Sequence, residues 1–165
     1  MNTPSVLPHS VARICAAVLL SGVVAASSVG AVELPTRNVT EKDQLAFQFR
    51  HLQTELLVAA LSCGRKDIQS NYNSFVTRFG AALKTNGSTL KSYFARIYGS
   101  KNGANEMDSF MTRLSNELSL VSMREPGFCD RSNQLFAQVL AVPQKGIEQF
   151  AQRHLTEQVA QRQGS

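Results

Sequence analysis

Apolar side chains recur at intervals of three and four residues along most of the chain, which is the spacing of one face of an α-helix. The first such stripe consists of Leu45, Phe49, Leu52, Leu56, Ala59 and Cys63. Thr40 and Asp43 precede it in the arrangement of a capping box, with Asp in place of the usual Glu or Gln. Gly64 is a typical C-terminal stop. The pattern predicts a helix over residues 40–63 with Cys63 on its core-facing side.

The same spacing predicts four or five further helices. Their apolar stripes lie at residues 68–83, 90–97, 107–121, 135–140 and 147–155. Turn-forming residues separate these stripes: Asn86-Gly87, Gly99 with a loop over 100–104, and Pro126-Gly127. Residues that commonly begin helices follow the breaks: Ser88, Asn105, Ser132 and Pro143. Because no segment alternates between apolar and polar over the length of a strand, we expect an all-α fold, a compact antiparallel bundle of five to six helices.

The first 31 residues have a different character. Arg13 is followed by an uncharged stretch of small and apolar residues over 14–31 that ends in Val29-Gly30-Ala31, as in a secretory signal peptide cleaved after Ala31. An uncleaved membrane anchor is the alternative, since about 18 apolar residues lie at the lower limit for spanning a bilayer. The expected organisation is a signal peptide over residues 1–31, an extended leader over 32–39, a helical domain over 40–160 and a flexible tail over 161–165.

The number of cysteines in the exported chain depends on whether the signal peptide is removed. Cys15 would be removed with the signal, which leaves Cys63 and Cys129 in the exported chain. Because exported chains meet an oxidising environment, these two residues are expected to form one disulfide. Two buried free thiols are the alternative. Neither cysteine has a neighbouring cysteine or histidine at metal-ligand spacing, so no metal site is predicted.

Composition and charge indicate the class of protein, but they do not indicate a catalytic activity. The chain has 165 residues, of which 43% are apolar and 18% charged, as in an ordinary globular domain. Its 17 Lys and Arg against 12 Asp and Glu give a net charge of +5. These cations are scattered, and Arg65-Lys66 is their only adjacent pair. We therefore expect no nucleic-acid partner, while weak contact with a membrane surface or cell-wall polymer stays open.

The sequence contains few candidates for chemistry. His51 and Glu55 lie four residues apart on one helical face, close enough to share a ligand or to act as an acid/base pair. The simpler interpretation of the pair is a solvated polar edge of the first helix. Ser88 and Lys91 match the Ser-x-x-Lys motif, but the partner motifs of serine β-lactamases are missing. No catalytic residue and no cofactor are predicted from motifs.

Two segments of the chain carry a family resemblance. Residues 52–63 (LQTELLVAALSC) and 72–79 (YNSFVTRF) resemble a group of small exported helical proteins from alphaproteobacteria that carry no assigned function. The likeness extends through residues 90–98 and 107–119 and ends near Cys129. This resemblance implies a bacterial envelope or secreted location, and it brings no catalytic residue.

Two functions therefore stay open at the level of sequence. The first is a non-catalytic exported protein, periplasmic or secreted, that serves as an envelope adaptor, inhibitor or holding chaperone for an unknown protein or envelope partner, with its oligomeric state left open. The alternative is a small hydrolase with an acid/base centre at Glu55 and His51. An exposed apolar groove would favour the first function, and a pocket lined by Glu55 with a raised pKa would favour the second.

Overall fold

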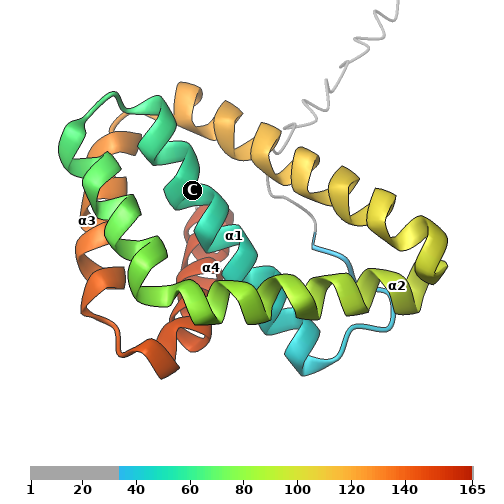
Figure 1. The fold of residues 1–165 in the computed structure, drawn as a ribbon. Coiled ribbons are helices and arrows are strands. Elements are labelled where there is room, and N and C mark those ends of the chain that lie inside the picture. The colour runs from blue at the N-terminus through green and yellow to red at the C-terminus, as the bar shows by residue number, and fades with distance from the viewer. Residues whose placement is uncertain (1–33, 165) are drawn as a thin grey trace, which may run out of the picture.

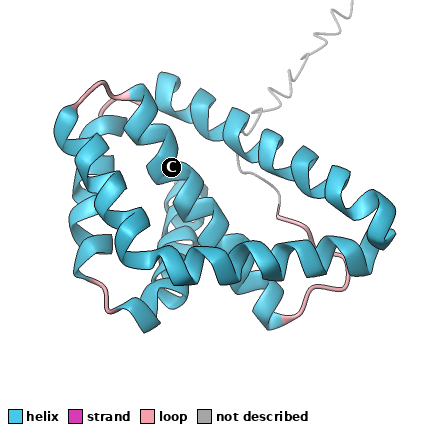
Figure 2. Ribbon diagram, in the orientation of Figure 1, coloured by secondary structure: helices cyan, strands magenta, loops and turns pink. Residues whose placement is uncertain are grey.

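The computed structural model describes residues 34–164, so the predicted signal peptide at 1–31 lies outside the described residues. Within this range the chain forms four α-helices and one short 3₁₀-helix, and it contains no strand (Figures 1 and 2). In chain order these are α1 (Glu41–Ser62), α2 (Lys66–Arg124), α3 (Phe128–Ala141), η1 (Gln144–Gly146) and α4 (Ile147–Gln163). The predicted all-α class is confirmed, whereas the prediction of five to six helices is wrong.

The long helix α2 accounts for the difference in helix number. It joins three predicted helices and changes direction at two residues with non-helical backbone, Phe79 (φ −105°, ψ 15°) and Gly99 (φ 81°, ψ 158°). These residues divide α2 into a first arm (66–78), a second arm (80–98) and a third arm (100–124), which are green, yellow-green and yellow to orange in Figure 1. The predicted break at Gly99 is therefore present as a sharp turn, because this left-handed backbone conformation suits glycine.

The other breaks predicted between residues 86 and 105 are absent. Asn86 is buried and donates its side-chain amide to the backbone carbonyl of Ala46 in α1 at 2.7 Å, so the helix continues through Gly87. Ser88 does not cap a helix, because its hydroxyl donates to the Lys84 carbonyl one turn earlier in the same arm. The predicted loop at 100–104 is helical, since the third arm begins directly after Gly99.

Helix ends elsewhere follow the sequence more closely. The capping box of α1 is present: the Thr40 hydroxyl accepts from the Asp43 backbone N–H, and the Asp43 carboxylate accepts from the Thr40 backbone N–H. Gly64 beyond α1 and Gly127 before α3 both have positive φ values. Helix α3 begins at Phe128 rather than near Ser132, and α4 continues to Gln163, past the predicted domain boundary at residue 160.

Helix α1 lies in the middle of the fold, with the arms of α2 on two sides and α3 and α4 on the others (Figure 1). Its apolar residues are buried around most of its circumference, including Phe47, which is outside the predicted stripe. The Phe47 ring meets Tyr93 of the second arm and Phe110 of the third arm edge to face, with centroids 4.9 and 5.2 Å apart. Such aromatic contacts add to the burial of apolar area, so Phe47 fixes both arms to α1.

The leader before α1 is held against the second arm. The Tyr93 hydroxyl donates to the Arg37 carbonyl at 3.0 Å. The Arg96 guanidinium forms an ion pair with Asp43 at 2.6 Å and lies over the Tyr93 ring, 5.4 Å from its centroid. Because these contacts involve both Arg37 and Asp43, they fix the direction in which the leader approaches α1.

Close packing of the second and third arms of α2 generates a testable difference between two glycines. A β-carbon at Gly103 would lie 2.8 Å from backbone atoms of Phe94 and Ala95, whereas one at Gly80 would meet nothing within 4 Å. We expect Gly103→Ala to lower the free energy of unfolding by about 1–3 kcal/mol through overpacking. Gly80→Ala, the matched control, should raise it by up to about 1 kcal/mol. Urea denaturation measures both, and equal effects would contradict the close approach of the arms.

Candidate functional site

His51 and Glu55, the polar pair that the sequence places on one face of α1, are buried and do not form a solvated edge. His51 is 5% exposed, and the side chain of Glu55 is 12% exposed. Helix α4 packs over this side of α1 and supplies the partners of Glu55. The residues that the sequence placed on one face of α1 therefore lie between two helices.

Glu55 is bonded at both of its carboxylate oxygens. Its Oε2 lies 3.0 Å from Nε2 of His154, and its Oε1 accepts a hydrogen bond from Nε2 of Gln158 at 3.0 Å. The His154 ring stacks on Phe150, one turn earlier in α4, with interplanar angle 9°. We call Glu55, His154 and Gln158 the α1–α4 clamp, because each of its bonds joins the two helices or orders the side chains that do so.

The electrostatics of the clamp favour an ionised carboxylate. Burial alone would raise the pKa of Glu55, but the hydrogen bond and charge of His154, the charge of His51 and the amide of Gln158 together hold this pKa below its ordinary value of 4.5. With Glu55 ionised, the Nε2–H of His154 donates to it. A general acid at neutral pH would need the opposite shift of its pKa. The direction found here suits a fixed hydrogen-bond acceptor.

Sequence reasoning found only half of this cluster. His51 and Glu55 were recognised because they share a helical face, and His51 does act on Glu55 through its charge. His154 and Gln158 were not predicted to lie beside them. Their i, i+4 spacing in α4, the same as that of His51 and Glu55 in α1, was the available signal.

Two surface hollows in the described part of the chain lie away from the clamp. One, of about 260 Å³, is lined by Thr40, Lys42, Asp43, Thr85, Ser88, Thr89, Ser92 and Arg96. The other, of about 410 Å³, is lined by Leu34, Pro35, Thr36, Tyr98, Phe110, Arg113 and Glu117. Neither hollow includes Glu55 or His51. Within residues 34–164 no group of three or more His, Cys, Asp or Glu side chains is arranged to hold a metal ion.

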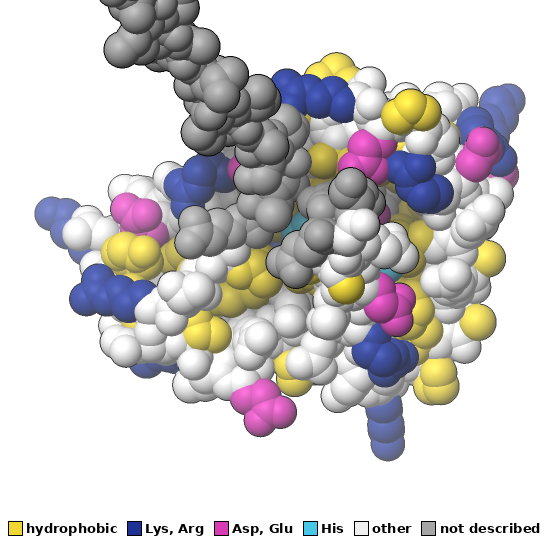
Figure 3. Space-filling view, turned by 180° about the vertical axis from the view of Figure 1, so that it is seen from behind, with side chains coloured by type: hydrophobic (Ala, Val, Ile, Leu, Met, Phe, Trp, Pro, Cys, Tyr) yellow, Lys and Arg dark blue, Asp and Glu magenta, His cyan; other side chains and the backbone are white. Residues whose placement is uncertain are grey.

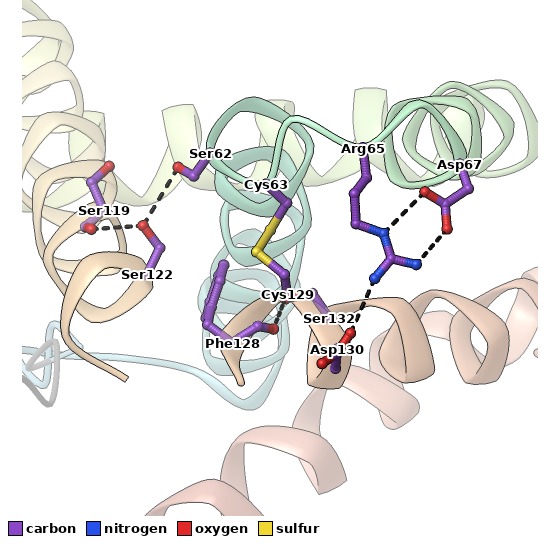
Figure 4. The surroundings of a disulfide bond; sticks show 10 residues. All are labelled: Ser62, Cys63, Arg65, Asp67, Ser119, Ser122, Phe128, Cys129, Asp130 and Ser132. Atoms are coloured by element: carbon purple, nitrogen blue, oxygen red, sulfur yellow. Dashed lines mark hydrogen bonds and ion pairs between the residues drawn. A yellow bond between two sulfur atoms is a disulfide. The ribbon is translucent and has the colours of Figure 1, made fainter. Parts of the chain in front are cut away.

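The two cysteines that were predicted to pair lie at disulfide-bonding distance. The sulfur atoms of Cys63 and Cys129 are 2.13 Å apart, and the bond joins the end of α1 to the start of α3 (Figure 4). Beside it, the Arg65 guanidinium bonds Asp67 at 2.7 Å and Asp130 at 3.0 Å, so it links the same two regions. The end of α1 is thus held to α3 both covalently and by an exposed ion pair.

None of the helices in the described range is long and apolar enough to cross a membrane. No protein-family model matches the chain, and comparison with curated proteins and with solved structures likewise finds no match. The geometry of the residues themselves is therefore the basis for a functional proposal.

The clamp predicts a pH-dependent contribution to stability. Because the pKa of Glu55 is lower in the folded chain, its contribution is present above pH 4.5 and is lost as the pH falls through the folded value. At pH 7, Glu55→Gln should lower the free energy of unfolding by about 1–3 kcal/mol, since it leaves buried donors without their charged acceptor. Near pH 3 the difference from wild type should shrink.

Urea unfolding at several pH values measures this effect. Glu157→Gln is the matched control, because Glu157 is an exposed carboxylate on the same helix as His154. It should change stability by less than about 0.5 kcal/mol at either pH. A loss in Glu55→Gln that stays constant down to pH 3 would contradict an ionised Glu55 in the clamp.

The disulfide predicts a redox-dependent stability. Cys63 and Cys129 are separated by 66 positions, and by the chain-entropy model the cross-link of such a loop stabilises the folded chain by about 4 kcal/mol. The double variant Cys63→Ser/Cys129→Ser should therefore lose about 2–4 kcal/mol. A reductant should destabilise the wild type to the same extent and leave the double variant unchanged. Wild-type unfolding that is insensitive to reductant would show that the thiols are free.

Proposed function

We propose that the chain is an exported, non-catalytic helical protein that acts by contact with a protein or envelope partner, as an adaptor, inhibitor or holding chaperone. Export is supported by the signal-like residues 1–31 and by the Cys63–Cys129 pair, because disulfides persist mainly in oxidising compartments. In this proposal the signal is removed after Ala31, and the processed chain begins at Val32. The resemblance to exported alphaproteobacterial proteins points to the same location.

The use of Glu55 inside the fold is the observation that carries the non-catalytic part of the proposal. A general acid or base has to come within hydrogen-bond reach of a substrate. Both oxygens of Glu55 are instead bonded to α4 side chains, and the carboxylate is almost fully buried. An acid/base centre at Glu55 and His51 would have to separate α1 from α4 before a substrate could enter.

A contact surface is supported by exposed apolar side chains at the disulfide end of the molecule. Leu61 and Met123 are each 74% exposed, and Leu120 is 40% exposed. Ser62 and Ser122, which neighbour Leu61 and Met123 in sequence, are joined by a hydrogen bond of 3.4 Å between their hydroxyls (Figure 4). We call Leu61, Leu120 and Met123 the apolar end patch. Flexible Met and Leu side chains adapt well to a protein partner.

The distribution of charge supports a partner other than nucleic acid. On the face shown in Figure 3, Lys and Arg side chains are spread around the molecule and do not gather into one stretch. A nucleic-acid site would need a basic patch or stripe. Weak attraction to an anionic membrane surface or cell-wall polymer remains part of the proposal, as a secondary contact.

Capture experiments with patch variants test the proposal. The double variant Leu61→Ser/Met123→Ser should unfold at nearly the wild-type temperature, because both side chains are largely in water. It should retain less than a tenth of any periplasmic partner that the immobilised wild type captures. Val159→Ser, at an exposed apolar position on α4, is the matched control and should capture normally. Equal capture by all three proteins would reject the apolar end patch as the contact surface.

The hydrolase alternative is tested by Glu55→Gln in a deletion strain. Loss of a general acid or base commonly costs about a hundredfold or more in rate while the fold survives. We expect complementation to follow the amount of folded Glu55→Gln protein in the periplasm. Failure to complement at normal abundance would favour catalysis at Glu55.

A further inference from the structure

The sulfur atoms of the described residues differ in how far they are open to a dissolved oxidant. Residues 34–164 contain five sulfur-bearing side chains: Cys63, Met107, Met111, Met123 and Cys129. The two cysteines are bonded to each other, so neither offers the thiolate with which peroxides react. Met107 and Met111 are partly buried and pack against the hydrophobic core. Met123 is 74% exposed, so its thioether is the most accessible of these sulfur atoms.

A methionine thioether reacts with a peroxide without activation by a neighbouring side chain. A lone pair of the sulfur atom attacks one peroxide oxygen, so an S–O bond forms while the O–O bond breaks. The sulfur loses two electrons, and the second oxygen of hydrogen peroxide leaves as water after taking the proton of the transferred oxygen. The product is methionine sulfoxide, a polar and chiral group that methionine sulfoxide reductases return to the thioether. An exposed methionine is therefore a reversible modification site wherever a peroxide is supplied.

Met123 lies in the apolar end patch, so a change in its polarity alters that surface. Leu120 precedes it by three residues in the third arm of α2, which places both side chains on the same side of the helix. The hydrogen bond of 3.4 Å between the hydroxyls of Ser62 and Ser122 joins this end of the arm to the residue after Leu61 (Figure 4). The thioether is thus the one group in the patch that an oxidant can convert from apolar to polar.

We propose that Met123 is an oxidation site for peroxides, and that its sulfoxide form weakens the binding of a partner to the apolar end patch. This inference rests on the proposed function, since export brings the chain into an oxidising compartment and the patch supplies the contact. The sulfoxide oxygen accepts hydrogen bonds from water. Its burial against an apolar partner surface removes that water without replacing it, which costs free energy.

Oxidation of Met123 is separable from damage to the fold. Because this side chain is largely in water, its sulfoxide displaces little packing. A sulfoxide at Met107 or Met111 would instead place a polar oxygen against the core, where it is costly. The order in which the three methionines react therefore decides whether a peroxide changes the surface or unfolds the chain. Their exposure predicts that the surface changes first.

Peptide mapping by mass spectrometry tests the site. The chain with its disulfide intact is treated with hydrogen peroxide at neutral pH, once in buffer and once in concentrated urea. In buffer we expect Met123 to be oxidised about tenfold faster than Met107 and Met111, whereas in urea, where burial is lost, the three rates should be nearly equal. Equal rates in buffer, or faster oxidation at Met107 or Met111, would overturn the proposed site.

Retention on a hydrophobic-interaction column measures the apolar surface without a partner. The oxidised wild type should elute earlier than the untreated protein, and Met123→Gln, with a polar side chain of similar length, should also elute earlier. Met123→Leu is the matched control: it keeps the patch apolar, lacks the reactive sulfur and should elute at the same position before and after treatment. The midpoint of thermal unfolding should change by less than about 2 °C in every form. Unchanged retention of the oxidised wild type, or an equal shift in Met123→Leu, would overturn the role of Met123.

Capture from the periplasm then tests the effect on binding. The oxidised wild type should capture about threefold to tenfold less of any partner that the untreated wild type captures, while Met123→Leu should capture equally before and after treatment. Undiminished capture by the fully oxidised wild type would overturn the regulation of binding. If the untreated wild type captures nothing, the proposed function fails and the regulation with it, whereas peptide mapping and column retention still decide on the oxidation site.

Discussion

The burial of α1 on all sides is the constraint on which the rest of the structure depends. Because α2, α3 and α4 all pack against this one helix, several polar groups that it carries into the interior are bonded to side chains of other helices. Glu55 finds His154 and Gln158 on α4, the Ala46 carbonyl accepts from Asn86 on α2, and Asp43 pairs with Arg96. These contacts determine which parts of α2 and α4 lie against α1, whereas apolar packing alone would tolerate several registers.

The sequence predicted the local features that depend on a few adjacent residues. The capping box at Thr40, the stop after α1 and the reversal at Gly99 all follow from backbone preferences that act within one turn. The course of α2 could not be predicted in this way. Asn86-Gly87 is a typical break, but a hydrogen bond to Ala46, 40 positions away, keeps that stretch helical. The bend lies at Phe79, a residue that is not a typical helix breaker, although Gly80 follows it.

In the candidate site, too, the sequence predicted contacts within one helix but not contacts between helices. Helical spacing brought His51 and Glu55 together on one face, yet it could not show which helix would cover that face. His154 lies 99 positions from Glu55, and one-dimensional periodicity contains no information on such a contact. Helix α4 also changes the expected environment of the face that carries His51 and Glu55. A polar face is expected to lie in water on an isolated helix, but it becomes an interface when a second helix supplies matching polar groups.

The disulfide also determines how the molecule would respond to mechanical load. All of α2 lies within the covalent ring that Cys63 and Cys129 close. A force applied between the two ends of the chain would pass from α1 through the sulfur atoms into α3 and would bypass the three arms of α2. Only α1, α3, α4 and the connecting segments could then be extended, so more than half of the helical residues would be shielded from traction. Similarly, a single proteolytic cut within α2 would leave the two pieces joined as one molecule.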